Sequence, residues 1–157
     1  MFNKFYIIFL FLMLTTTGCG FKVVNQSERL NFKITEIESS GERRINFRIK
    51  NALIESSTSN NNNEISLKLR SYKDKSVKEK NNRNEATKYQ ININVEIDFN
   101  EMKSSKNGTF SVKDSGDYNV ESQYSDTLNN EKKLIEIITD KLADKILDEL
   151  VLKINAL

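Results

Sequence analysis

The side chains that most often carry catalysis are nearly absent from this sequence. It contains no histidine, and its only cysteine is Cys19. These counts exclude an imidazole general base, a histidine-ligated metal, an intramolecular disulfide and a four-cysteine zinc site. Asp114 and Asp117 lie close together, but aspartates beside a glycine are ordinary turn residues. Because a glycine-rich phosphate loop and a nucleophile motif are also missing, we expect no enzyme, no cofactor and no metal site.

The chemistry that remains is a cluster of cations in residues 68–88. Eight lysines and arginines there are opposed by Asp74, Glu79 and Glu85, so the segment carries +5, whereas the whole chain carries +2. Clustered cations attract polyanions through their summed potential and through charge-assisted bonds to phosphate. A solvated loop kept soluble by lysine is the alternative interpretation. Nucleic acid is not an expected partner, because Tyr72 is the main aromatic residue near the cations.

The position of Cys19 predicts where the protein resides. Lys4 precedes an apolar run at residues 5–14, and small or polar residues follow up to Gly18. This pattern is typical of a secretory signal peptide, and the run is too short to span a bilayer. Gly18-Cys19 also resembles a lipobox, in which the cysteine is acylated and becomes the new N-terminus. An ordinary signal peptide with a chance cysteine, or an uncleaved anchor, is the alternative.

These features predict a signal peptide at 1–18, a lipidated tether at 19–29 and one domain at 30–157. A first strand is expected at residues 30–37. Residues 42–54 fit both a strand and a helical stripe, and Ser39 followed three residues later by Glu42 favours a capped helix.

Strands are expected to dominate the middle of the chain. Residues 65–69 alternate between apolar and polar, whereas residues 72–88 are so polar that we expect a mobile hairpin tip or a long exposed extension. Residues 89–99 alternate without error, which predicts a strand about 36 Å long with one apolar face.

The residues after this strand predict a turn, a further strand and a final helix. Asn107-Gly108 is expected to form a turn, and a fourth strand is expected at residues 110–124, with a bulge at residues 115–117. Leucine and isoleucine then recur every four residues, which predicts a helix at about 130–153 that starts at Asn129 or Asn130 and packs on the sheet.

Three short stretches give a family resemblance. They are Gly18-Cys19-Gly20-Phe21, the lead into the longest strand at residues 86–95, and the ending from Tyr118 through Glu131 to the last helix. Together they resemble the LPS-assembly lipoprotein family (LptE). The resemblance implies an α+β two-layer sandwich, with two helices packed on one face of a four-stranded mixed sheet. It also implies a role in supporting and plugging the β-barrel LPS translocon (LptD) and in contacting lipopolysaccharide.

The resemblance points to candidate contact residues and to a location. The family's basic position in the hairpin falls on Asn82, so its neighbours Lys80 and Arg83 are the candidates for LPS phosphates on charge and location alone. The family's second basic position falls near Leu128, where there is no matching cation. Gly20, rather than aspartate, after Cys19 implies the periplasmic face of the outer membrane. An accessory lipoprotein that docks on another periplasmic protein, such as a cell-wall synthase, is the alternative function.

Overall fold

Unbroken alternation of apolar side chains places one long strand at the centre of the protein. In the computed structural model, which describes residues 32–57, 63–103 and 106–155, this strand pairs with a neighbour on each side. The odd-numbered side chains from Ile91 to Phe99 are buried, and the even-numbered ones face away from the core. The elements are β1 (Lys33–Gly41), α2 (Arg43–Ser56), β2 (Glu64–Lys80), β3 (Ala86–Glu101), β4 (Lys106–Asn119) and α3 (Tyr124–Asn155).

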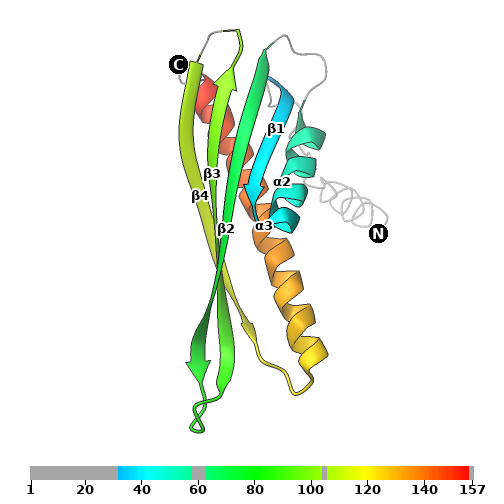
Figure 1. Cartoon of the computed structure of the whole chain (residues 1–157), viewed down its shortest axis with the longest axis vertical. Helices are drawn as coiled ribbons and strands as arrows, with labels where there is room; N and C mark the ends of the chain where they lie inside the picture. The colour runs from blue at the N-terminus through cyan, green and yellow to red at the C-terminus, as the bar shows by residue number, and fades with distance from the viewer. Residues whose placement is uncertain (1–31, 58–62, 104–105, 156–157) are drawn as a thin grey trace, which may run out of the picture.

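The sheet is mixed and has the strand order β1-β2-β3-β4. β1 runs parallel to β2, and the two later pairs are antiparallel. α2 forms the crossover between the parallel strands, as parallel pairing requires. α2 packs against β1 and β2, and α3 packs against β4 and β3, so both helices lie on one face of the sheet (Figure 1). The expected α+β fold with two helices on a four-stranded mixed sheet is confirmed.

The core lies between the sheet and the two helices. Ile49 and Leu53 of α2 and Leu142 and Ile146 of α3 are fully buried in one apolar cluster that also includes the odd-numbered residues of β3. Burying side chains of this size contributes roughly 1.5–3 kcal/mol each. The helical interpretation of residues 42–54 and the apolar stripe of the last helix are therefore confirmed. None of the described helices is both long enough and apolar enough to cross a membrane.

Two glycines that resembled turn or bulge signals instead make room for side chains. Gly108 is inside β4 and pairs with Phe99, whose ring would lie 2.7 Å from an added Cβ. Gly116 pairs with Ile91 in an unbroken register, and its missing side chain admits Leu134 of α3. The predicted turn at residues 107–108 and the predicted bulge at residues 115–117 are therefore wrong.

The predicted element ends also need correction. β1 covers residues 33–41 and so ends four residues later than predicted, whereas residues 30 and 31 of the predicted strand lie outside the described residues. Ser39 is therefore a strand residue, and Glu42 precedes α2 without a capping side chain. The backbone N–H of Glu42 instead donates to Ser71 Oγ, at 3.0 Å. β4 ends at Asn119, and α3 starts at Tyr124 rather than near residue 130, with Thr127 Oγ1 accepting from the Glu121 N–H at 2.8 Å.

Candidate functional site

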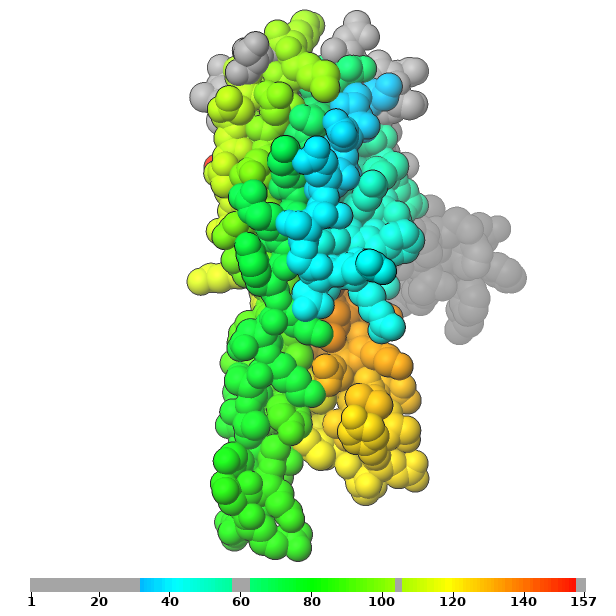
Figure 2. All heavy atoms as spheres, viewed as in Figure 1, coloured from blue at the N-terminus to red at the C-terminus, as the bar shows by residue number. Residues whose placement is uncertain are grey.

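The β2–β3 hairpin extends beyond β1, and its turn end extends beyond the last residue of β4, Asn119, which pairs with Lys88. β1 pairs with β2 only as far as Ser71, and the remainder of β2 is held by β3 alone on the way to its end at Lys80. Residues 72–88, predicted as a mobile tip or a long extension, thus form two paired strands with a short turn between them. The turn end of the hairpin projects past the first turns of α3 (Figures 1 and 2).

Most of the cations in residues 68–88 have acidic partners on other elements. Within the described residues, seven of the eight form ion pairs. The eighth, Lys80, donates a hydrogen bond to the side-chain amide of Asn84. The local +5 charge is therefore largely offset by acids that the sequence places elsewhere. The pairs are Lys68–Glu38, Arg70–Glu96, Arg70–Asp98, Lys73–Glu42, Lys75–Glu131, Lys78–Asp117, Arg83–Glu85 and Lys88–Glu79.

The structure brings the two candidate cations, Lys80 and Arg83, together at the hairpin turn. Asn81 organises this turn, because its Oδ1 accepts the backbone N–H of Arg83 at 2.9 Å and that of Glu85 at 3.0 Å. Asn84 adopts a φ of 63°, which asparagine tolerates better than most residues. Lys80 Nζ donates to Asn84 Oδ1 at 2.9 Å.

Arg83 is the more available of the two cations at the turn. Its side chain is 80% exposed, and its Nε lies 3.5 Å from Glu85 Oε2. Exposed pairs of this kind contribute about 0–1 kcal/mol, so an incoming anion displaces them at little cost. Asn82 lies between the two cations, exposed at the turn.

A cluster that the sequence did not reveal joins the hairpin to α3. Lys75 Nζ lies 2.6 Å from Glu131 Oε2, and the same oxygen accepts a hydrogen bond from Tyr118 Oη at 2.7 Å. The ammonium also lies 4.4 Å from the Tyr89 ring centroid and 5.3 Å from that of Tyr118. The two rings stack at 5.7 Å because their residues are paired across β3 and β4. Only that cross-strand register could have predicted the cluster.

The cluster favours the charged forms of its lysine and its glutamate. Partial burial opposes the charge on Lys75, but the hydrogen bond and the charge of Glu131 outweigh it and raise the pKa of Lys75 to about 12. Burial likewise works against the Glu131 carboxylate, yet the bonds from Lys75 and Tyr118 lower its pKa below 4.5. The ion pair between Lys75 and Glu131, beside the two stacked tyrosine rings, therefore holds the hairpin against the first half of α3.

A groove opens beside this cluster, between the start of α2 and the first half of α3. Its volume is about 530 Å³, and Ile45, Leu128 and Ile135 line its apolar part. The position near Leu128, where the resemblance left a basic contact unmatched, is therefore bordered by three cations from other elements and by one from α3 itself. The three are Arg43, Arg44 and Lys73, and the fourth is Lys132.

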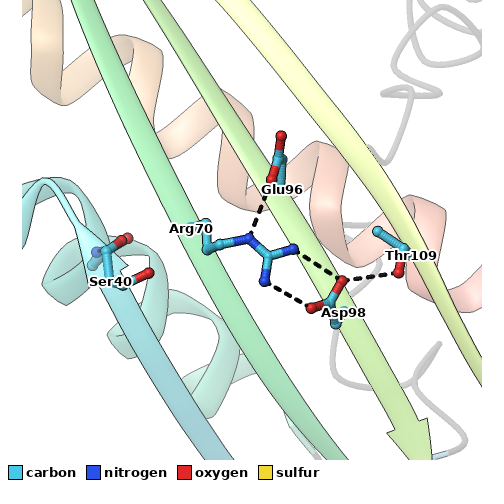
Figure 3. A network of polar contacts seen from close by, with 6 residues as sticks. Ser40, Arg70, Glu96, Asp98 and Thr109 are labelled. Carbon is cyan, nitrogen blue, oxygen red and sulfur yellow. Dashed lines mark hydrogen bonds and ion pairs between the residues drawn. The ribbon is translucent and has the colours of Figure 1, made fainter.

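The face of the sheet opposite the helices carries a polar network. Arg70 on β2 reaches across to β3, where it donates to Glu96 at 3.2 Å and to Asp98 at 3.0 and 3.3 Å (Figure 3). Thr109 on β4 donates to Asp98 at 2.9 Å. Hydrogen bonds from Thr109 and then from Arg70 lower the pKa of Asp98. Side chains from three strands thus satisfy one another on this open face.

The remaining residues singled out in the sequence do not form a site together. Asp114 and Asp117 lie inside β4 rather than in a turn, and their separation of three residues turns them to opposite faces. Asp114 pairs with Lys145 at 3.3 Å, and Asp117 pairs with Lys78. Cys19, the signal peptide and the tether lie outside the described residues.

Comparisons with known proteins agree on the fold. No family model and no curated protein matches the sequence. Rare lipoprotein B from Shewanella oneidensis matches with a TM-score of 0.59 at 14% identity, over 78% of this chain and 98% of that one. Lipoprotein B from Nitrosomonas europaea matches with a TM-score of 0.62 at 11% identity, over 87% of this chain and 94% of that one.

The two matches define a class, the small two-layer α+β fold found in bacterial lipoproteins. Within that class, the chain has the fold of rare lipoprotein B, with the long central hairpin and both helices on one face of the sheet. The fold implied by the resemblance to the LPS-assembly lipoprotein family is confirmed.

Proposed function

We propose that this protein is an outer-membrane lipoprotein that supports and plugs the β-barrel LPS translocon (LptD) and assists LPS assembly at the cell surface. The observation that carries the proposal is the match to rare lipoprotein B, which extends over 98% of that chain. A match of this extent takes in nearly the whole of that chain rather than a shared fragment. The sequence resemblance to the LPS-assembly lipoprotein family points in the same direction.

The open face of the sheet suits the inside of a barrel. Its residues on β2, β3 and β4 are polar or charged, and no described helix covers them. The lumen of a membrane barrel is itself lined by polar side chains, so two polar surfaces can meet there through hydrogen bonds and water. The sheet narrows from four strands to three beyond Ser71 and to two at the end of the hairpin, beyond Glu79 and Lys88, and this tapering shape can enter such a lumen.

Two further parts of the proposal concern contacts and attachment. Lys80 and Arg83 at the hairpin turn contact phosphates of lipopolysaccharide, because they are the cations there with weak or neutral partners. Residues 1–18 are removed, and lipid on Cys19 holds the protein on the periplasmic side of the outer membrane. Several acyl chains anchor a protein far more firmly than a single one.

The test combines purification with crosslinking. A C-terminally tagged full-length protein is purified from outer membranes in mild detergent, with a photoreactive residue at Ser111 on the open sheet face. A matched variant carries the same residue at Lys141, which is exposed on α3. We expect a stoichiometric large β-barrel in the eluate, crosslinked through position 111 and weakly or not at all through position 141. Recovery of a cell-wall synthase, or of no partner, would reject the translocon role while leaving the fold unchanged.

A further inference from the structure

The open face of the sheet contains a hollow whose polar side chains have no partners. It has a volume of about 600 Å³ and lies next to the Arg70 network. The even-numbered residues of β2 and β3 and the odd-numbered residues of β4 lie on this face of the sheet, and the intervening residues Lys73, Ile93 and Asp114 also line the hollow. The projecting side chains are Tyr72, Asp74, Asn92, Asn94, Lys113 and Ser115.

The strand register arranges these six side chains as a grid of two rows. Tyr72, Asn94 and Lys113 are directly paired across three strands, and they form one row. Asp74, Asn92 and Ser115 form the next row. Neighbouring strands lie about 4.8 Å apart, and same-face residues along a strand about 6.7 Å, so the grid measures roughly 10 by 7 Å. This is the area that a disaccharide covers.

The grid differs from the rest of the face in its unused hydrogen-bonding capacity. One row away, Arg70, Glu96, Asp98 and Thr109 satisfy one another. Within the described part of the chain, the grid side chains make no hydrogen bond or ion pair. Two amides, a carboxylate, two hydroxyl groups and an ammonium are therefore available, and each amide can donate and accept at once.

Tyr72 gives the grid its one apolar surface. Its side chain is 53% exposed, although aromatic rings usually find a packing partner in a folded protein. A closely packed protein contact generally has several large apolar side chains at its centre, which this hollow lacks, so a polar protein surface facing the sheet would leave the hollow to a small ligand. A sugar ring has one apolar face and a rim of hydroxyl groups, and it matches a single ring surrounded by amides.

We propose that this hollow binds a short acidic oligosaccharide. One sugar ring stacks on Tyr72, and the amides of Asn92 and Asn94 exchange hydrogen bonds with its hydroxyl groups. The acidic substituent lies at Lys113, and Asp74, at the opposite corner, accepts from hydroxyl groups further along the chain of sugars. The site requires neither the barrel nor the lipid anchor, so it goes beyond the proposed function.

Acidic glycans of the cell envelope come from two sources, and the experiment separates them. Full-length protein in a phosphocholine detergent, which has no sugar headgroup, is titrated with three probes and followed by saturation-transfer NMR. The probes are the lipid-free oligosaccharide of lipopolysaccharide, the N-acetylglucosamine–N-acetylmuramic acid disaccharide of peptidoglycan, and neutral maltotriose. We expect one acidic probe to bind at least tenfold more tightly than maltotriose, with saturation strongest on one sugar face. Equal binding of maltotriose, or binding of no probe, would overturn the proposal.

Variants then locate the site. Tyr72→Ala and Asn94→Ala are each expected to weaken binding about tenfold, because each removes a contact of about that strength. Tyr124→Ala is the matched control, since Tyr124 is 76% exposed at the start of α3 and outside the hollow. All three variants are first checked for an unchanged circular-dichroism spectrum and melting temperature. Binding that survives Tyr72→Ala, or a hollow that crosslinks only to a protein, would assign the surface a different role. Barrel recovery in the purification is measured separately, so failure of either proposal leaves the other intact.

Discussion

Lys75 and Glu131 are 56 residues apart in the chain, yet Lys75 Nζ lies 2.6 Å from Glu131 Oε2. The pair joins the part of β2 that has left β1 to the first half of α3. Because Tyr118 donates to the same carboxylate and packs beside the same ammonium, one acid organises three elements. The position of the hairpin relative to the helix therefore depends on the charge of Glu131.

Removing that charge is expected to destabilise the protein in a pH-dependent way. Glu131→Gln should lower the free energy of unfolding by about 1–2 kcal/mol near pH 7, because Lys75 loses its charged partner. The pKa of Glu131 is below 4.5 in the folded protein, so this stabilisation is present above pH 4.5 and is lost as the pH falls through the folded pKa. Urea unfolding between pH 3 and pH 7 measures it. The exposed acid Asp148, changed to Asn, is the control, and a difference independent of pH would contradict the role of the pair.

A second prediction concerns the junction between β1 and α2. Gly41 has a φ of +94°, and an added Cβ would lie 2.1 Å from the Ser71 carbonyl oxygen. Gly41→Ala is expected to cost about 3 kcal/mol or more, because both the backbone conformation and the contact with the backbone of β2 are lost. Gly116→Ala is the comparison, since its Cβ meets only the flexible end of Leu134 and should cost about 1–2 kcal/mol. Thermal and urea unfolding of both variants measure these costs. Equal losses of unfolding free energy in the two variants would disprove the argument.

The candidate cations at the hairpin turn lead to a prediction about binding. The double variant Lys80→Ala, Arg83→Ala should weaken lipopolysaccharide binding about tenfold at low salt, and the difference should shrink as salt screens the charges. Stability should change by less than about 0.5 kcal/mol, because both side chains are exposed. Lys133→Ala with Lys141→Ala removes the same charge from α3 as a control. Undiminished binding by the hairpin variant would exclude these two residues.

Attachment through Cys19 can be tested on the intact protein. Mass spectrometry of the wild-type N-terminus should find a chain that begins with an acylated Cys19. Cys19→Ser should lose the lipid, and the protein should leave the outer-membrane fraction, because no described helix could hold it there. A wild-type chain with an unmodified Cys19 would reject the lipid anchor.

Periodicity predicted the parts of the fold in which one layer packs on another. The error-free alternation of residues 89–99 and the four-residue repeat of the last helix both reflect burial against the same core, and both are confirmed. Gly108 was misread because its role depends on Phe99, a partner that only the strand register identifies. Local turn statistics contain no information about such a partner.

The candidate site was predictable in location but not in charge. The sequence indicated a basic segment and an exposed hairpin, and the structure has one there. It could not indicate that Glu38, Asp117 and Glu131 from three other elements, and Glu42 from the connection before α2, neutralise that segment. Ion pairs between distant residues depend on the assembled sheet, so a local charge count overestimates the free positive charge.

The early end of β1 has a consequence for how copies of this protein avoid one another. From Tyr72 onward, β2 presents backbone N–H and C=O groups with no described strand beside them. Such an edge is a template for intermolecular pairing and fibre growth. Four lysines lie along it with only two acids between them, so two identical edges would force like charges together whenever they aligned in parallel. The lysines that give the hairpin its basic character therefore also protect a long bare strand from self-assembly.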